Sequence, residues 1–383
     1  MKNLLKTLFV TLILLGITSC EKNDSTEDAS QNSECILDFV DLNTYFGSAI
    51  YIDFIDDNNG WIIGKQYSPI KYVLINTSDG GNTWSIVDDD FQLDFDNGFV
   101  SGEALQFVTP TNGFKKLHNP TTPDKLRIQF TTDKGATWND ITNPFFDVNN
   151  NPEDISWAET FASNGMETIV FGKNDYDIFI IKIDNNTMQL TYSNRIDQNT
   201  YPVIIEEHAG IGYHFAADNT ITAVVTESSN YSGDVKIAQS TDLGTTWTIT
   251  SNVLDEGQFI SSTWPDDNVG FVAVGFYSGA QNIYKTTDGG TNWEALPNSS
   301  QLPGFQMIRF ADENNGIGIT DFDFYTTNDG GSSWKQITCK DTNGYDYGAG
   351  FDEVISYPSV NNGWVSGRNK NINKIGIFHY TGN

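Results

Sequence analysis

The feature that most constrains this chain is an eight-residue motif that occurs five times among otherwise different sequences. Each copy, which we call a box, reads Ser or Thr, any residue, Asp, any residue, Gly, any residue, then Ser, Thr or Asn, and Trp. The copies are TSDGGNTW (77–84), TTDKGATW (131–138), STDLGTTW (240–247), TTDGGTNW (286–293) and TNDGGSSW (327–334). Such recurrence indicates a protein built from repeated units.

Three positions are identical in every box, and each suits a tight hairpin. The glycine adopts a positive φ without strain, and the aspartate accepts hydrogen bonds from N–H groups of the turn. The tryptophan begins the returning strand and buries its ring between neighbouring sheets. The aspartates are Asp79, Asp133, Asp242, Asp288 and Asp329; the glycines are Gly81, Gly135, Gly244, Gly290 and Gly331; the tryptophans are Trp84, Trp138, Trp247, Trp293 and Trp334. We expect a structural role for them and no catalytic one.

The box resembles the Asp-box, or BNR repeat, of sialidases, sortilin-type receptor domains, xyloglucanases and the photosystem II assembly-factor family. That resemblance implies a β-propeller with the boxes at its periphery, away from the ligand face. It does not imply an activity, because these families share none.

The spacing of the boxes indicates one further unit without a box. Successive box tryptophans lie 54, 109, 46 and 41 residues apart, and the interval of 109 spans about two repeats. The segment 178–192 lies in this interval and consists of two alternating strands around the turn Asp184-Asn185-Asn186. We therefore expect a hairpin there that has lost the glycine and the tryptophan of the box.

A second signature precedes most boxes and reads as a strand, an Asn/Asp-Gly turn and another strand. Its copies are FIDDNNGWIIG from Phe54, FVTPTNGFKKL from Phe107, WPDDNVGFVAVG from Trp264, FADENNGIGI from Phe310 and YPSVNNGWVSG from Tyr357. With the boxes, these signatures predict an all-β fold: a seven-bladed β-propeller of four-stranded antiparallel blades. The predicted blades are 46–88, 102–142, 155–193, 201–250, 257–297, 303–338 and 350–380.

The last predicted blade has only three strands, and the apolar segment Cys35–Val40 is left over at the N-terminus. We expect this segment to complete the last blade, which would remove an exposed sheet edge. The two signatures together most resemble the photosystem II assembly-factor propellers, over nearly all of the mature chain. That family has a basic surface patch, whereas this chain has only four arginines: Arg127, Arg195, Arg309 and Arg368.

The first 33 residues predict export and lipidation. Lys2 and Lys6 precede the short apolar run Leu8–Leu15, and Ile17-Thr18-Ser19-Cys20 has the form of a lipobox. We expect residues 1–19 to be a lipoprotein signal peptide, Cys20 to carry the lipid anchor, 20–33 to be a flexible acidic tether and 34–383 to be the propeller. This predicts an outer-membrane lipoprotein on the cell surface, with the periplasmic leaflet, or an ordinary secretory signal, as alternatives.

The formal net charge of −29 limits the partners of the chain. Nucleic acids and other polyanions should be repelled, so no nucleic-acid partner is expected. Acidic clusters at Asp88-Asp89-Asp90 and at Asp94 and Asp96 offer oxygen ligands that suit Ca²⁺, but no EF-hand spacing is present. The alternative is that the charge serves solubility, and we predict no cofactor.

Two cysteines remain besides Cys20, and they leave two alternatives open. Cys35 begins the predicted closing strand, and Cys339 follows the outer strand of the sixth blade. In an oxidising compartment they would either form a disulfide at the seam of the ring or stay as two free thiols.

Turns between the first and second strands and the boxes should share one face, which we call the box face. The opposite face, here the loop face, receives the turns between the second and third strands and the connections between blades, where binding residues are expected. Its aromatic candidates for stacking on a glycan or contacting a protein are Tyr67, Phe91, Phe95, His118, Phe145, Phe146, Tyr176, Tyr201, Tyr231, Tyr277, Tyr345 and Tyr347. We expect about half of them to pack onto the blades instead.

Catalysis has weaker support. The arginine motif that sialidases use to bind a carboxylate is missing, and the acidic surface opposes an anionic substrate. A polysaccharide lyase needs a base and a cation, and His208, Tyr213 and His214 with Arg195 are the one cluster that offers them. The alternative for these residues is ordinary hydrogen bonding in a blade. We therefore predict a binding or scaffold module for glycan or protein ligands, with a lyase or glycosidase as the alternative.

Overall fold

The computed structural model describes most of the propeller region and nothing before Leu37. The described residues are 37–92, 105–119, 122–141, 157–173, 177–197, 212–227, 233–251, 254, 256–275, 281–297, 302–320, 322–337, 350–369 and 374–382. They all belong to the compact unit Cys35–Asn383. Strands are the only regular elements among them, and they contain no apolar helix of a length that could cross a membrane.

The strands of the described residues form five four-stranded sheets and one eight-stranded sheet, and every pairing is antiparallel. The sheet nearest the N-terminus contains β2 (Ser48–Phe54), β3 (Gly60–Tyr67), β4 (Ile70–Thr77) and β5 (Ser85–Asp88). The next contains β6 (Leu105–Phe107), β7 (Gly113–Asn119), β8 (Thr122–Thr131) and β9 (Asn139–Asp140). A third contains β10 (Trp157–Ser163), β11 (Glu167–Lys173), β12 (Asp177–Asp184) and β13 (Leu190–Asp197).

The eight-stranded sheet consists of two groups of four. They are β14 (Gly212–Phe215), β15 (Ile221–Glu227), β16 (Gly233–Ser240) and β17 (Thr248–Ser251), then β18 (Glu256–Thr263), β19 (Gly270–Gly275), β20 (Gln281–Thr286) and β21 (Glu294–Ala295). The two groups join only where two residues of β16 pair with two of β18. A further sheet contains β22 (Met307–Phe310), β23 (Gly316–Ile319), β24 (Phe324–Thr327) and β25 (Lys335–Ile337).

The sheet at the C-terminus is completed by the N-terminal strand. Its strands are β26 (Gly350–Ser359), β27 (Asn362–Asn369), β28 (Lys374–Tyr380) and β1 (Leu37–Asp41). β1 pairs with β28, from Leu37 opposite Tyr380 to Asp41 opposite Gly376. The Lys374 ammonium donates to the Asp41 carboxylate at the far end of this pair and holds the pKa of Asp41 at about 2. The prediction that the leftover segment joins the last three strands in one sheet is confirmed for Leu37–Asp41, whereas Cys35 lies outside the described residues.

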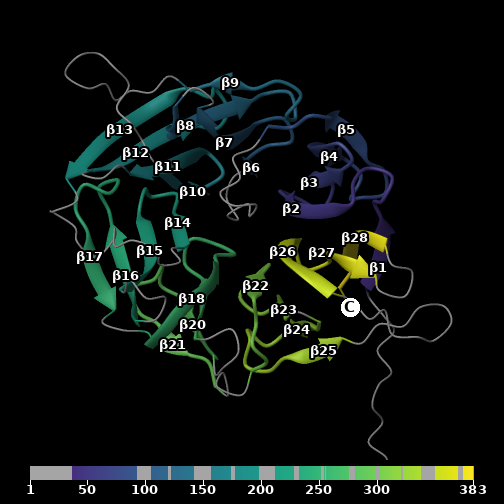
Figure 1. Ribbon diagram of the computed structural model, residues 1–383. Helices are drawn as coiled ribbons and strands as arrows, with labels where there is room; N and C mark the ends of the chain where they lie inside the picture. The colour runs from purple at the N-terminus through teal and green to yellow at the C-terminus, as the bar shows by residue number, and fades with distance from the viewer. Residues whose placement is uncertain are drawn as a thin grey trace, which may run out of the picture. The chain divides into compact units, whose positions relative to one another are not determined.

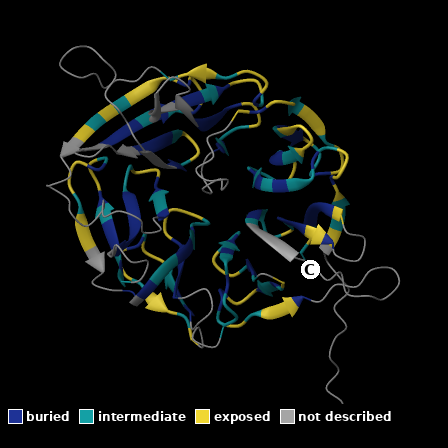
Figure 2. Cartoon of the chain, in the orientation of Figure 1, coloured by how far each residue is buried: buried dark blue, intermediate teal, exposed yellow. Residues whose placement is uncertain are grey.

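The sheets lie side by side around a common centre, as in a β-propeller (Figure 1). The first strands of neighbouring sheets contact one another, as β10 does with β14 and β18 with β22, and β26 contacts β2. Exposed positions gather on the fourth strands, such as β5 and β13, while the second and third strands are mostly buried (Figure 2). The core therefore lies between sheets, because each sheet buries both of its faces.

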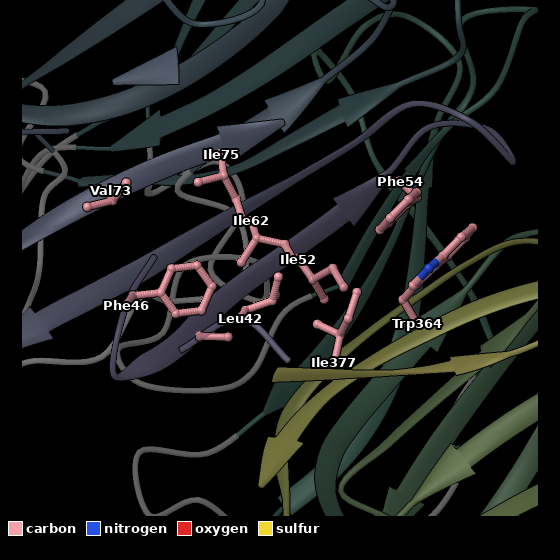
Figure 3. Packing of buried hydrophobic residues seen from close by; sticks show 10 residues of the cluster. Leu42, Phe46, Ile52, Phe54, Ile62, Val73, Ile75, Trp364 and Ile377 are labelled. Atoms are coloured by element: carbon pink, nitrogen blue, oxygen red, sulfur yellow. The ribbon is translucent and has the colours of Figure 1, made fainter. Parts of the chain in front are cut away.

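The contact between the last and first sheets shows how this core is built. Ile52, Ile62 and Ile75 from β2, β3 and β4 pack with Trp364 of β27 and Ile377 of β28 (Figure 3). All five are at most 3% exposed. Burial of five large apolar side chains contributes about 1.5–3 kcal/mol each, and this stabilises the contact between the last and first sheets.

An aromatic stack recurs between neighbouring sheets and explains the second signature. The aromatic residue that follows the turn glycine lies flat on the aromatic residue that ends the first strand of the next sheet. The stacks are Trp61 on Phe107 (centroids 3.7 Å apart, planes at 4°), Phe271 on Phe310 (3.6 Å, 6°) and Trp364 on Phe54 (3.6 Å, 2°). The stack of Trp364 on Phe54 joins the last sheet of the chain to the first.

The unit without a box retains its hairpin. β12 and β13 pair around a turn in which Asp184 Oδ1 accepts the N–H groups of Asn186 (3.0 Å) and Thr187 (2.7 Å). Met188 takes the positive φ of 55° that glycine takes in a box. Asn185 is fully buried and accepts from Thr168 Oγ1 at 2.6 Å. The predicted hairpin is confirmed, and buried side-chain hydrogen bonds take the place of the missing tryptophan.

Candidate functional site

Each box is a closed network of hydrogen bonds, shown by the copy at 77–84. Thr77 Oγ1 donates to Asp79 Oδ1 at 2.8 Å and accepts from the Gly81 N–H at 2.9 Å. The Asp79 carboxylate accepts from the Thr83 N–H at 2.9 Å and from the Thr83 hydroxyl at 2.6 Å. Trp84 Nε1 donates to the Gly81 carbonyl at 3.0 Å. These bonds, the Thr83 pair first, hold the pKa of Asp79 below its ordinary value.

The other boxes repeat this network with one difference. At Asp133, Asp242, Asp288 and Asp329 burial opposes ionisation, but hydrogen bonds from the same positions outweigh it and the pKa is lowered. The closing tryptophan donates to the box glycine in four copies, whereas Trp334 Nε1 has no partner among the described residues. The carboxylates are occupied within their own turns, which leaves them unsuited to catalysis.

Boxes and first-to-second turns lie at the same end of the sheets. The Gly80 N–H donates to the Asn58 carbonyl at 3.0 Å, and the boxes at 133, 288 and 329 make the same bond to their own first-to-second turns. This is the box face, as predicted. In every box, the residue before the box glycine has a positive φ. Three copies have a second glycine at this position, and the other two have Lys134 (67°) and Leu243 (54°).

Among the described residues, no group of three or more His, Cys, Asp or Glu side chains has a geometry that could hold a metal ion. In the first acidic run, Asp88 Oδ1 accepts the Asp90 N–H at 3.0 Å and Asp89 lies 3.4 Å from Lys71 Nζ. Asp94 and Asp96 lie outside the described residues, as do Cys20, Cys35 and Cys339.

The candidate lyase residues have separate packing contacts. Tyr213 stacks on Phe171, with centroids 4.1 Å apart and planes at 14°. His214 stacks on Trp264 at 4.3 Å and 6°, and its Nε2 lies 3.6 Å from Asp267 Oδ1. Burial lowers the pKa of His214 to about 4, although Asp267 and its neighbours oppose this shift. A neutral, stacked histidine between two sheets has the character of a core residue.

Arg195 lies on a different strand from these two. It is opposite Phe179 in the pairing of β12 with β13, and its guanidinium lies 5.8 Å from the centroid of that ring. β13 is the outer strand of its sheet, whereas β14, which carries Tyr213 and His214, contacts the first strands β10 and β18 (Figure 1). His208 lies outside the described residues. The geometry therefore gives the described members three separate packing roles.

Exposed apolar side chains mark the loop face. Tyr67 and Ile70 face each other across the second-to-third turn of the first sheet and are 58% and 69% exposed. Lys65 Nζ lies 5.5 Å from the centroid of the Tyr67 ring. Phe322 lies in the equivalent second-to-third turn of another sheet, β22–β25, and is 64% exposed. Tyr67 and Ile70 are neighbours, and Phe322 lies at a separate turn of the same face.

Phe322 was not among the sequence candidates, and Phe91, which was, packs inside. Two N–H groups of the Phe322 turn, those of Phe322 and Asp323, point to Thr320 Oγ1 at 3.3 and 3.0 Å, and this small turn presents the ring to solvent. Phe91 is 1% exposed and lies beneath Lys115, whose Nζ is 4.4 Å from the ring centroid. The structure does not describe the side chains of the remaining aromatic candidates. They are Phe95, His118, Phe145, Phe146, Tyr176, Tyr201, Tyr231, Tyr277, Tyr345 and Tyr347.

A polar residue near the end of the first strand receives an N–H group of the next sheet. Asp53 Oδ2 accepts from Phe107 at 3.2 Å, and Ser356 Oγ accepts from Phe54 at 2.9 Å. Burial raises the pKa of Asp53 to about 6, against the opposing effects of the Phe107 N–H, the Tyr51 hydroxyl and the charge of Arg309. These acceptors align the first strands, and sequence patterns gave no indication of them.

One open cavity of about 390 Å³ lies between β5 and the second box. Thr83, Ser85 and Ile86 line one side, and Asp133 and Lys134 line the other. Thr83 and Asp133 use their polar side-chain atoms in the box networks.

Comparison with known proteins identifies the fold. Neither a protein-family model nor a curated protein sequence matches the chain. Among solved structures, YCF48 bound to a D1 peptide is 17% identical, with 92% of this chain and 98% of that chain covered and a TM-score of 0.54. The β-propeller domain of the Trilobed protease from Pyrococcus furiosus is 8% identical (88% and 96% covered, TM-score 0.56). An oligogalacturonate lyase from Vibrio parahaemolyticus is 12% identical (91% and 98%, TM-score 0.54). The chain is a β-propeller.

Proposed function

We propose that this chain is a lipid-anchored, seven-bladed β-propeller of the outer membrane that binds a glycan or a protein through its loop face. The exposed aromatic and apolar tips Tyr67, Ile70 and Phe322 carry this proposal, because they lie at separate turns of one face and are the described groups best suited to a contact. The blade count rests on seven groups of four strands, with the eight-stranded sheet taken as two blades.

A ligand that touches several turns is a polymer rather than a small molecule. The tips belong to different sheets, and the cavity described above lies elsewhere, beside the second box. A propeller of this fold binds a peptide in YCF48, and another belongs to an oligogalacturonate lyase, so both ligand classes are compatible with the fold. Carboxylates fixed in boxes and the packed, neutral His214 favour binding over turnover.

Binding is tested with the full-length protein in detergent on arrays of polysaccharides and peptides. Tyr67→Ala and Phe322→Ala should each weaken the captured ligand by about fivefold, equivalent to roughly 1 kcal/mol for one stacked ring. Met166→Ala is the matched control, because Met166 is 59% exposed on a first-to-second turn of the box face. Equal affinity of all three variants and the wild type would exclude the loop face. Turnover of an acidic polysaccharide would replace binding with the enzymatic alternative.

The anchor is tested separately. Cys20→Ala should leave the protein without lipid and move it from the membrane fraction to the soluble fraction, because no other anchor is proposed. Mass spectrometry of the N-terminal peptide reports the lipid directly. Retention of the variant in the membrane would show that the anchor lies elsewhere.

A further inference from the structure

The cavity between β5 and the second box is lined by a buried amide that is only half satisfied. Asn76 of β4 lines this cavity and is 8% exposed. Its side-chain nitrogen donates to the carbonyls of Gly60 at 3.0 Å and Thr77 at 2.9 Å, whereas its Oδ1 accepts no hydrogen bond from any described residue. A buried amide oxygen needs a donor, and one that lines an open cavity can take it from a ligand or from water.

Three further polar groups of the lining are available to a ligand. The Lys134 ammonium and the hydroxyls of Ser78 and Ser85 form no hydrogen bond or ion pair with the described part of the chain. Ile86, which is 53% exposed, and Val87 add an apolar surface beside them. The cavity therefore combines a cation, an amide oxygen and two hydroxyls with an apolar patch.

The length of one side chain explains why this gap stays open. Gln239 and Lys285 each stand directly before a box, as Asn76 does, and both reach across to the next sheet. Gln239 Nε2 donates to the Gly289 carbonyl in the next box, and Lys285 Nζ donates to the Glu313 carbonyl at 3.0 Å. Asn76 is shorter and bonds within its own sheet, so the space between β5 and the second box is left for something else.

Lys134 takes a conformation that its turn does not need a side chain to adopt. Its φ is 67°, and three of the five boxes have glycine at this position, where such an angle causes no strain. Leu243, the other side chain at this position, packs against a hydrophobic cluster. The Lys134 ammonium has no comparable contact, and it borders the cavity. The strained backbone therefore places a cation where a ligand would lie.

We propose that this cavity binds a neutral sugar unit of a glycan, at a site separate from the loop face. The Lys134 ammonium donates to one sugar hydroxyl, Asn76 Oδ1 accepts from another, and Ile86 packs against C–H groups of the ring. The volume of about 390 Å³ lies within the range of about 300–1,000 Å³ that small-molecule sites occupy. The Asp133 carboxylate borders the same cavity, and the net charge of −29 also opposes an anionic ligand.

Saturation-transfer NMR tests this site with the full-length protein in a detergent that has no sugar headgroup. The probes are the methyl glycosides of glucose, galactose and mannose. We expect at least one of them to bind with a dissociation constant on the order of 1 mM, because a single sugar unit has few atoms to contact. Lys134→Gly should weaken this binding about tenfold and Ser85→Ala about fivefold, since each removes a hydrogen bond to the ligand.

Matched controls come from the third box. Leu243→Gly changes the same box position as Lys134→Gly, and Thr248→Ala changes the residue after the box tryptophan, as Ser85→Ala does; both should leave sugar binding unchanged. Asn76→Gln should abolish binding, because the longer amide can cross the gap as Gln239 does. Urea unfolding should show Lys134→Gly to be no less stable than the wild type, so that its loss of binding is not a loss of folding.

Three results would overturn the proposal. They are no transfer to any of the three sugars, equal weakening by Lys134→Gly and its control Leu243→Gly, and stronger binding of a methyl glucuronoside than of the neutral sugars. The third result would assign the cavity to an anion. None of these results bears on the loop face, whose ligand is tested with other variants.

Discussion

Replacing Asp53 by asparagine should stabilise the protein at neutral and alkaline pH. Burial raises the pKa of Asp53 to about 6 from the ordinary value of 3.8 for an aspartate. Between these values the folded state binds a proton that the unfolded state does not, so the contribution of this carboxyl to stability is present below pH 4 and is lost as the pH rises through 6. The asparagine amide oxygen can accept the Phe107 N–H without carrying a charge.

The magnitude follows from the shift. Two pKa units correspond to about 3 kcal/mol of unfavourable ionisation in the folded state. The Asp53 side chain keeps partial contact with solvent, and Arg309 attracts its charge. We therefore expect Asp53→Asn to raise the free energy of unfolding by about 1–2 kcal/mol at about pH 8, and by nothing at about pH 4.

The assay is urea unfolding followed by tryptophan fluorescence at these two pH values. Ser356→Ala is the control, because Ser356 accepts the equivalent N–H of Phe54 without a titratable group. It should lose about 1 kcal/mol at both pH values. A gain for Asp53→Asn that does not change with pH would refute the reasoning, since only the ionised carboxyl is unfavourable.

Three further predictions concern stability. Trp364→Ala should lower the free energy of unfolding by about 3–5 kcal/mol, because Trp364 is fully buried and stacks on Phe54 between the last and first sheets. The control Ile86→Ala, at a 53% exposed position, should lower it by less than about 0.5 kcal/mol, and similar losses for both variants in urea unfolding would contradict this. Lys134→Gly should gain about 0.5–1 kcal/mol by relieving a positive φ of 67°, and a loss would mean that the lysine side chain stabilises the box. His214→Phe keeps the stack on Trp264 and removes a group whose pKa in the folded state is about 4. As the pH falls from about 7 to about 5, the free energy of unfolding of the wild type should drop by about 1–2 kcal/mol relative to this variant. Parallel pH profiles of stability would show that His214 does not titrate as described.

Local signals explain why much of the fold could be predicted. A box or an Asn-Gly turn fixes a hairpin within a dozen residues, so the order of the strands followed from their spacing. The pairing of β1 with β28 followed from a strand that was otherwise without a partner. The stack of Trp61 on Phe107 and the acceptor role of Asp53 could not be predicted, because each joins residues about 50 positions apart and has no local pattern.

The candidate site was less predictable for the same reason. Tyr213 and His214 are residue types that serve catalysis. Their sequence does not reveal that Phe171 of the preceding sheet and Trp264, which follows β18, are their stacking partners. Phe322 lies in an alternating stretch that looks like a strand, and only the hydrogen bonds to Thr320 Oγ1 turn it outward. Exposure of a ring depends on how tightly its turn closes, which is a property of the folded chain.

The pairing of β1 with β28 also sets how the protein bears a mechanical load. A pull on the segment before Leu37 acts along the strand axis, and the hydrogen bonds of an antiparallel pair lie across that axis. The five residue pairs of β1 are then strained together in shear, instead of opening one after another from an end. Tension applied between this segment and the opposite ends of the strands would run lengthwise through the sheet, the direction in which a sheet yields only when a whole row of hydrogen bonds breaks at once.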